Sequence, residues 1–259
     1  MRLYNDDCLN VLKDIPSESI DLVVTDCPYR IVQGGCSNNT VTFKAMSGVL
    51  DKRKRGCGKC SIKWETEGQL NNIENVKAGK IFDHNDIEFK EWLPDVYRVL
   101  KPNSHCYIMI NARNLKDLQI EAEKVGFKYQ QILIWNKGNA TPNRWYMQGY
   151  EMILMLRKGK AVPIKNLGEK NIISVPNIKS GKKIHPTEKP VELMKIFIEN
   201  SSNENDTILD PFMGTGSCGV ASKELNRDFI GIEIDKKYYD IAYERLRNNQ
   251  EENKWEDLD

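Results

Sequence analysis

The sequence predicts an α/β fold in which a mostly parallel sheet is covered by helices on both faces. Short apolar runs typical of strands alternate with helical patterns, and one run, residues 207–210, leads directly into a glycine-rich turn and a helix. After Glu233 only one more helix fits, so strands from the N-terminal part must complete the sheet around that turn. Ligands of such open sheets bind at the carboxyl ends of the strands.

The elements of the first half follow from apolar runs and end signals. The helix that ends near Leu100 opens with a capping-box pattern, Asn85 with Glu88, and is ended by Pro102. The first half is expected to hold strands at residues 3–5, 22–25 and 107–110 and helices at residues 7–13, 85–100 and 115–124.

The second half supplies the strands around the turn. It is expected to hold strands at residues 131–135, 152–156, 207–210 and 229–234 and helices at residues 191–200 and 236–248, besides the helix after the turn. The strands at 3–5 and 22–25 should lie beside the last two strands. That arrangement brings Asp7 and Asp26 to the same sheet edge as Gly214.

The glycine-rich turn has the pattern of a nucleotide-binding corner. Gly214, Gly216 and Gly219 fit G-x-G-x-x-G, in which small residues let the backbone approach a ligand at an electropositive helix N-terminus. Glu233 follows about 20 residues later, where a carboxylate can accept both hydroxyls of a ribose. The turn alone is weak evidence, so its meaning depends on two other segments.

The first segment is an apolar run that ends in Asp26-Cys-Pro-Tyr29, and the second is His185-Pro-Thr-Glu-Lys-Pro190, directly before an amphipathic helix. In this order, with Asp-Pro-Phe-Met-Gly-Thr-Gly-Ser at residues 210–217, the chain resembles the β-class DNA amino-methyltransferases. Their catalytic motif, Asp/Ser-Pro-Pro-Tyr, precedes the cofactor motif. One departure is Cys27, which stands where the family usually has its first proline.

The resemblance implies a Rossmann-like methyltransferase sheet with circularly permuted motif order and inserted basic loops, and S-adenosylmethionine as the cofactor. Glu233 would bind the ribose, Asp7 the adenine amino group, and Thr187 and Lys189 would lie near the methionine end. The methionine part would be lined by residues of the turn: Asp210, Pro211, Phe212, Gly214, Thr215, Gly216 and Ser217. An N-cap of the following helix is the structural alternative for Asp7.

The catalytic motif, Asp26, Cys27, Pro28 and Tyr29, can be interpreted from the chemistry of methylating an exocyclic amine. The lone pair of such a nitrogen is delocalised into the base, so the site needs acceptors for both N–H hydrogens. Ionised Asp26 is acceptor-only, and the backbone carbonyl of Cys27 is the second candidate. Tyr29 offers an aromatic face for stacking the base. A covalent role for the Cys27 thiol is the rival hypothesis.

Length and composition indicate one catalytic domain, residues 1–259, since 259 residues at 40% hydrophobic content suffice for a large core. The net charge is only +1, but residues 30–80 carry +6 and residues 157–183 carry +7. We expect residues 30–80 to be an inserted basic loop region that contacts phosphates, and residues 138–184 to be a target-recognition region. A solvated charged face is the alternative for both.

These features predict duplex DNA as the partner, with the target base rotated out of the stack. A homodimer and a cognate restriction endonuclease stay open as further partners. The sequence contains no membrane-spanning run and begins without a signal peptide, so a cytoplasmic location with reduced cysteines is expected. Cys36, Cys57 and Cys60, with His84, give an incomplete zinc pattern, and no metal is predicted.

Three functions compete at this point. A DNA amino-methyltransferase explains every motif, and the leading Asp26 favours adenine N6 over cytosine N4 by resemblance. An NAD-dependent dehydrogenase would explain the glycine turn and Glu233 but leaves residues 26–29 and the basic loops without a role. A non-catalytic DNA-binding protein on the same fold would require a broken active site, for which Cys27 is the only sign.

Overall fold

The computed structural model describes residues 1–28, 87–141, 146–178 and 188–248, and these ranges form part of one compact unit. Tyr29, Thr187 and the residues of the predicted loop 30–80 lie outside them. Within the described ranges, every helix is too short or too polar to cross a lipid bilayer.

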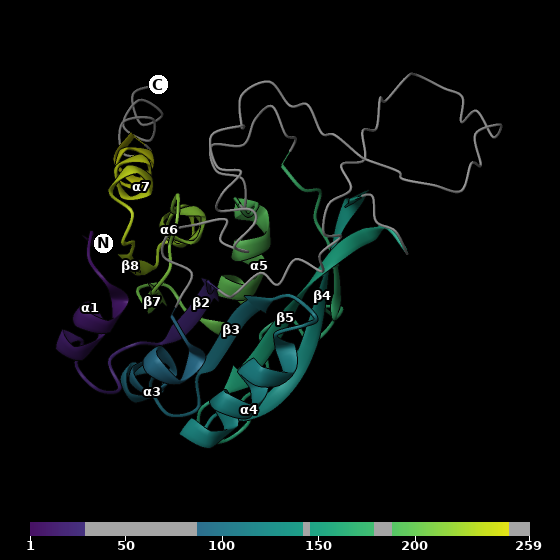
Figure 1. Cartoon of the computed structure of the whole chain (residues 1–259), viewed down its shortest axis with the longest axis horizontal. Helices are drawn as coiled ribbons and strands as arrows, with labels where there is room; N and C mark the ends of the chain where they lie inside the picture. The colour runs from purple at the N-terminus through teal and green to yellow at the C-terminus, as the bar shows by residue number, and fades with distance from the viewer. Residues whose placement is uncertain (29–86, 142–145, 179–187, 249–259) are drawn as a thin grey trace, which may run out of the picture. The chain divides into compact units, whose positions relative to one another are not determined.

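In the described part of the chain, eight strands form one sheet in the order β1-β8-β7-β2-β3-β5-β4-β6 (Figure 1). The strands are β1 (Arg2–Tyr4), β2 (Leu22–Asp26), β3 (His105–Ile110), β4 (Lys128–Thr141), β5 (Gln148–Arg157), β6 (Ile172–Ser174), β7 (Thr207–Asp210) and β8 (Asp228–Ile232). All neighbouring pairs are parallel except those of β5 with β3 and β4. The mostly parallel α/β sheet is therefore confirmed.

The N-terminal strands complete the sheet, as the chain order predicts. β2 pairs with β7 through Leu22 and Ile208, and β1 pairs with β8 through Leu3 and Gly231. Because these strands are parallel, their carboxyl ends meet at one edge.

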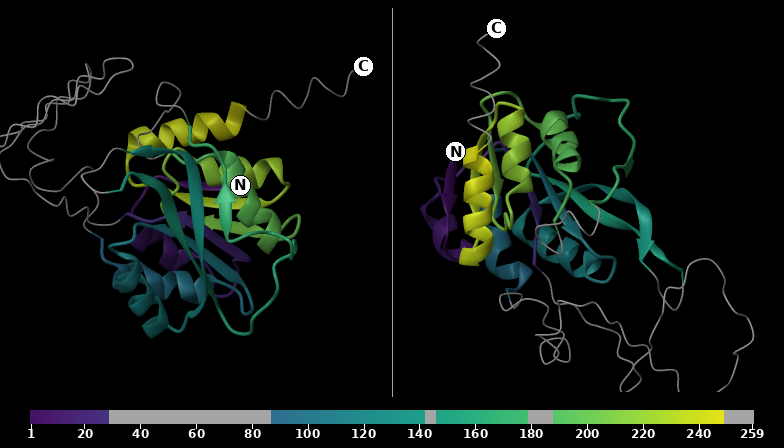
Figure 2. Two further views of the ribbon diagram at one scale, coloured as in Figure 1. Left: turned by 90° about the vertical axis from the view of Figure 1, so that its right-hand side faces the viewer. Right: turned by 90° about the horizontal axis from the view of Figure 1, so that it is seen from above.

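Helices cover both faces of the sheet, as Figure 2 shows. The helices are α1 (Cys8–Asp14), α3 (Phe89–Val99), α4 (Leu115–Val125), α5 (Val191–Ser201), α6 (Ser217–Glu224) and α7 (Lys236–Asn248). Side chains of α1, α3 and α4 share one buried cluster with alternate strand residues such as Val23 and Ile108. Those of α5, α6 and α7 share a second cluster with the intervening residues, Val24 and Met109. Each strand at the centre of the sheet is thus buried on both faces.

Three details differ from the sequence-based expectations. Strands β4 and β5 form an antiparallel hairpin that extends well beyond the apolar runs at 131–135 and 152–156, and β6 is an additional short strand. The capping box of α3 also lies three residues later than expected. Glu88 is the N-cap, and the side chain of Glu91 accepts a hydrogen bond from the Glu88 N–H at 2.7 Å.

Candidate active site

Four acidic residues predicted for the site lie at the carboxyl ends of neighbouring strands. Asp26 ends β2, Asp210 ends β7, Glu233 follows β8 directly, and Asp7 follows β1. β2 and β7 are linked at this edge by a hydrogen bond of 2.7 Å from Thr25 Oγ1 to Asp210 Oδ1. The fold therefore brings the catalytic motif and the cofactor motif to one edge of the sheet.

The glycine turn is held directly against Glu233. The Gly214 N–H donates to Glu233 Oε2 at 2.9 Å, and the Asp235 N–H donates to Oε1 at 2.9 Å. Gly214 has a φ of +53°, which favours glycine, and a Cβ built there would meet no described atom within 4 Å. Open space thus lies over the turn beside an oriented carboxylate, an arrangement that fits a ribose-containing cofactor.

Gly219 has a different function, which is close packing of α6 on the sheet. A Cβ at this position would lie 2.8 Å from the ring of Phe229 on β8. Only glycine lets the helix approach the strand this closely. The third glycine of the pattern is therefore structural, while the first faces open space.

Asp210 is a buried carboxyl at the centre of the site. Its Oδ1 accepts hydrogen bonds from Thr25 Oγ1 and, at 3.1 Å, from the Phe212 N–H. Burial raises the pKa of Asp210 to about 7, and the nearby carboxylates of Asp26 and Glu233 also raise it. An ionised Asp210 is therefore favoured by any cationic group that binds beside it.

We expect Asp210→Asn to stabilise the protein while weakening cofactor binding. The raised pKa means that wild-type protein loses stability as the pH rises from about 4 through about 7, because the folded state resists ionisation of Asp210. Asparagine keeps the acceptor oxygen but does not ionise. Thermal melts from pH 4 to 8 should show Asp210→Asn gaining stability relative to wild type toward pH 8. A stability difference between Asp210→Asn and wild type that stays the same from pH 4 to 8 would contradict a raised pKa for Asp210.

Asp26 is paired with Lys189, the lysine that the sequence placed near the cofactor. Lys189 Nζ lies 2.5 Å from Asp26 Oδ2, across 163 positions of sequence. The preceding residue, Glu188, is buried and accepts a hydrogen bond from Arg245 of α7 at 2.9 Å. Arg245 also donates to the Thr215 carbonyl at 3.2 Å. One arginine thus fastens both the glycine turn and the segment that carries Lys189.

Two further charged residues extend this ion pair and were not predicted from the sequence: Glu151 contacts Lys189, and Lys137 contacts Glu151. Glu151 of β5 lies with Oε2 at 3.3 Å from Lys189 Nζ, and its Oε1 lies 3.0 Å from Nζ of Lys137 on β4. The available signal was a lone acidic residue directly before the apolar run of β5. It gave no indication of a partner, because the pairing depends on the antiparallel hairpin.

The thiol of Cys27 does not have the properties of a nucleophile. It is buried and lies 3.8 Å from the Met109 carbonyl, where it can donate a weak hydrogen bond. Burial raises the pKa of the Cys27 thiol well above its ordinary value, and the charge of Asp26 adds to the shift. Because thiolates rather than thiols attack carbon, this environment argues against covalent catalysis.

The remaining predicted residues have these positions. Asp7 is the N-cap of α1, with Oδ1 accepting from the Leu9 N–H at 2.9 Å, so the structural alternative holds for that oxygen. Phe212 packs edge-on against Trp92, with ring centroids 5.2 Å apart. Thr215 and Ser217 are buried, Gly216 is the N-cap of α6, Pro28 is half-buried, and Pro211 directly follows β7.

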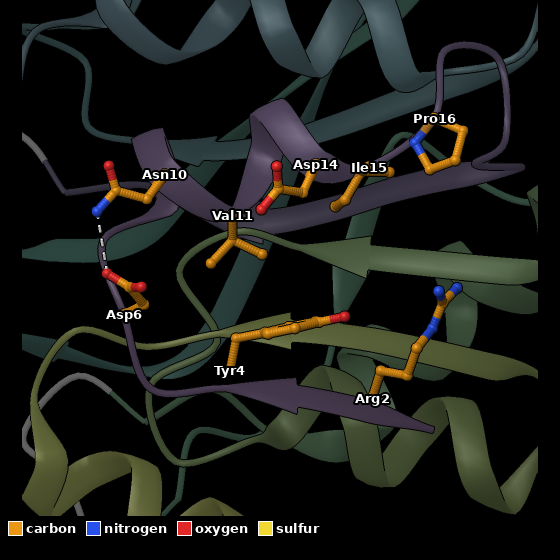
Figure 3. A pocket seen from close by; sticks show the side chains of 8 residues that line it. All are labelled: Arg2, Tyr4, Asp6, Asn10, Val11, Asp14, Ile15 and Pro16. Atoms are coloured by element: carbon orange, nitrogen blue, oxygen red, sulfur yellow. Dashed lines mark hydrogen bonds between the residues drawn. The ribbon is translucent and has the colours of Figure 1, made fainter.

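A cavity of about 170 Å³ lies between β1 and α1 and contains none of the predicted site residues (Figure 3). Asp6 and Asn10 on its wall are hydrogen-bonded to each other at 3.1 Å. The cavity is smaller than the roughly 300–1,000 Å³ typical of pockets for small-molecule ligands and cofactors. In the described part of the chain, no three His, Cys, Asp or Glu residues are grouped as metal ligands. Cys36, Cys57, Cys60 and His84 lie outside that part.

Solved structures share this fold over nearly the whole chain. The crystal structure of an M1.HpyAVI–SAM complex matches with a TM-score of 0.64 and 26% identity, over 95% of this chain and 99% of that one. PvuII DNA methyltransferase, which is cytosine-N4-specific, matches with a TM-score of 0.67 but only 18% identity, over 94% and 85% of the two chains, which shows the fold alone. The fold and site define an S-adenosylmethionine-dependent class I methyltransferase.

Sequence comparison gives the family. A family model for N6 and N4 amino-methylation, described as DNA methylase, matches residues 20–244. The type II methyltransferase M2.DpnII of Streptococcus pneumoniae is 31% identical over 273 residues, which cover 98% of this chain and 92% of the relative. M.HinfI of Haemophilus influenzae is 32% identical over 263 residues, 93% and 67% of the two chains. The chain belongs to this DNA methylase family and is a DNA methyltransferase, which excludes the dehydrogenase alternative.

Proposed function

We propose that this methyltransferase modifies N6 of an adenine rotated out of duplex DNA, with Asp26 as the catalytic acceptor. The observation that carries the proposal is the position of Asp26: its carboxylate ends the strand next to the glycine turn and is oriented by Lys189. S-adenosylmethionine, when bound at this edge, would supply an electrophilic methyl group. Asp26 and the Cys27 carbonyl accept hydrogen bonds from the two N–H groups of the target amine, which localises the nitrogen lone pair. Asp26 then takes up the proton that the methylated nitrogen loses.

The cofactor side of the proposal assigns roles to the residues around the turn. Glu233, fixed by two backbone N–H groups, accepts the ribose hydroxyls, and Gly214 leaves room for the cofactor above the turn. Asp210 offers a carboxylate to the cationic methionine part. Roles for Asp7, Thr187 and Tyr29 rest on the resemblance.

The DNA-contacting segments are proposed to be residues 30–80 and 138–184. Both segments carry positive charge, and in the second segment Tyr146 is 95% exposed and Met147 is 63% exposed directly before β5. Type II methyltransferases belong to restriction–modification systems. A cognate restriction endonuclease is therefore a candidate partner. A second copy of the chain is another candidate partner. The cytoplasm is the proposed location of the protein.

The test is the chemical identity of the product. Duplex DNA treated with the protein and S-adenosylmethionine should yield N6-methyldeoxyadenosine after nucleoside digestion and mass spectrometry, at one short sequence. N4-methyldeoxycytidine would overturn the choice of base alone. Methylation of RNA or protein with none in duplex DNA would overturn the proposed substrate.

A further inference from the structure

Four side chains of alternating charge run through the site in one continuous chain of ion pairs. Asp26, Lys189, Glu151 and Lys137 are joined at 2.5, 3.3 and 3.0 Å in that order. They come from β2, the segment before α5, β5 and β4. The proposed function needs an acceptor at Asp26, but it does not by itself explain the other end of this chain of ion pairs.

The side chains of Lys189 and Lys137 are almost fully buried. The Lys189 side chain is 9% exposed and that of Lys137 is 12% exposed. Burying an ammonium group is costly unless it is paired, so both lysines depend on the carboxylates beside them. Lys137 also lies over the ring of Trp135, with Nζ 5.8 Å from its centroid. The hairpin therefore holds Lys137 in place against Glu151.

The pairing is uneven, because Glu151 has two lysines and shares one of them with Asp26. Burial alone would raise the pKa of Glu151, but Lys189 and Lys137 together hold it below its ordinary value. Burial raises the pKa of Asp26, Lys189 opposes the rise, and Glu151 adds to it. Among described groups, Asp210 on β7 and the neutral Cys27 thiol are the other titratable neighbours of Asp26.

We propose that Glu151 and Lys137 are positioning residues for methyl transfer, which together set how much of the Lys189 charge acts on the Asp26 carboxylate. Glu151 attracts the Lys189 ammonium away from Asp26, and Lys137 reduces that attraction by neutralising Glu151. The inference rests on the proposed role of Asp26. It requires that substitutions of Glu151 and of Lys137 shift the pH midpoint of methyl transfer in opposite directions, which a merely structural role would not produce.

The test is the pH dependence of the single-turnover methylation rate, measured with saturating S-adenosylmethionine so that ionisation of Asp210 in the free protein does not contribute. Transfer needs ionised Asp26, so the rate rises with pH through the pKa of that carboxyl. In Glu151→Gln, Asp26 should no longer share Lys189 with a carboxylate at position 151, and the midpoint should fall by roughly half a pH unit or more. In Lys137→Met, the midpoint should rise by a similar amount. The double variant should return toward wild type.

Controls keep the outcome decisive if one variant folds poorly. Lys137→Arg keeps the charge and should restore the wild-type midpoint, and Lys195→Met removes a lysine that pairs with Glu192 and Glu224 on α5 and α6 and should leave it unchanged. Midpoints that stay fixed, or that move in the same direction in both single variants, would overturn the inference. An active Asp26→Asn would instead show that the proposed role of Asp26 has failed.

Discussion

Replacement of Asp26 by alanine is expected to lower the single-turnover rate of methyl transfer by about 10²- to 10⁴-fold, the range typical of a catalytic side chain that handles protons. The carboxylate of Asp26 lies at the end of β2, while the carboxylate of Glu233, which we propose binds the ribose, follows β8, two strands away in the sheet. Cofactor affinity should therefore stay within a few-fold of wild type. Rapid-quench assays with radiolabelled methyl groups give the rate, and calorimetry gives the affinity.

Cys27→Ser is the matched control for this prediction, because it changes the adjacent side chain and keeps the backbone carbonyl. It should remain active to within a few-fold, since the buried, neutral thiol has no chemical role. An inactive Cys27→Ser with normal cofactor affinity would restore the covalent mechanism. An Asp26→Ala protein that still transfers methyl groups would remove Asp26 from the chemistry.

Replacement of Glu233 by alanine is expected to weaken S-adenosylmethionine binding by at least about tenfold, since each buried group left without a partner costs about 1–3 kcal/mol. Two effects combine. The ribose hydroxyls lose their acceptor, and the N–H groups of Gly214 and Asp235 lose theirs, which loosens the turn. Calorimetric titration of the folded variant measures the loss.

Asp235→Asn is the matched control for Glu233. Asp235 is the neighbouring carboxylate, and its Oδ1 accepts from the Lys237 N–H at the start of α7. Asparagine retains that acceptor and the backbone N–H, so affinity should change little. Equal losses in the two variants would indicate a general effect of removing acidic charge, and an unchanged affinity in Glu233→Ala would contradict the ribose assignment.

The sheet could be predicted because chain order and local pattern agree. A glycine turn with one helix left after Glu233 requires the N-terminal strands to complete the sheet, and the observed pairing of β2 with β7 confirms this. The bounds expected for the last helix, residues 236–248, agree with those of α7. The extent of the β4–β5 hairpin was not, because its outer residues are polar and their strand conformation depends on antiparallel pairing.

The site was predictable only where a motif names the residue. Asp26, Asp210 and Glu233 follow from strand ends, and the fold places them on one edge. The contact of Lys189 with Asp26 joins segments 163 positions apart, and Glu151 and Lys137 carry no motif recognised in the sequence. Such long-range ion pairs depend on side-chain geometry that no local pattern encodes.

We propose that one edge of the sheet is divided between an acceptor at Asp26 and a cofactor-holding carboxylate at Glu233. The most direct test compares single-turnover transfer into duplex DNA by Asp26→Asn and Glu233→Ala as the S-adenosylmethionine concentration is raised to saturation. Glu233→Ala should recover toward the wild-type rate, because only binding is weakened, while Asp26→Asn should remain inactive although its cofactor site is filled. Recovery of Asp26→Asn at high cofactor, or a Glu233→Ala rate that stays low at saturation, would contradict the account.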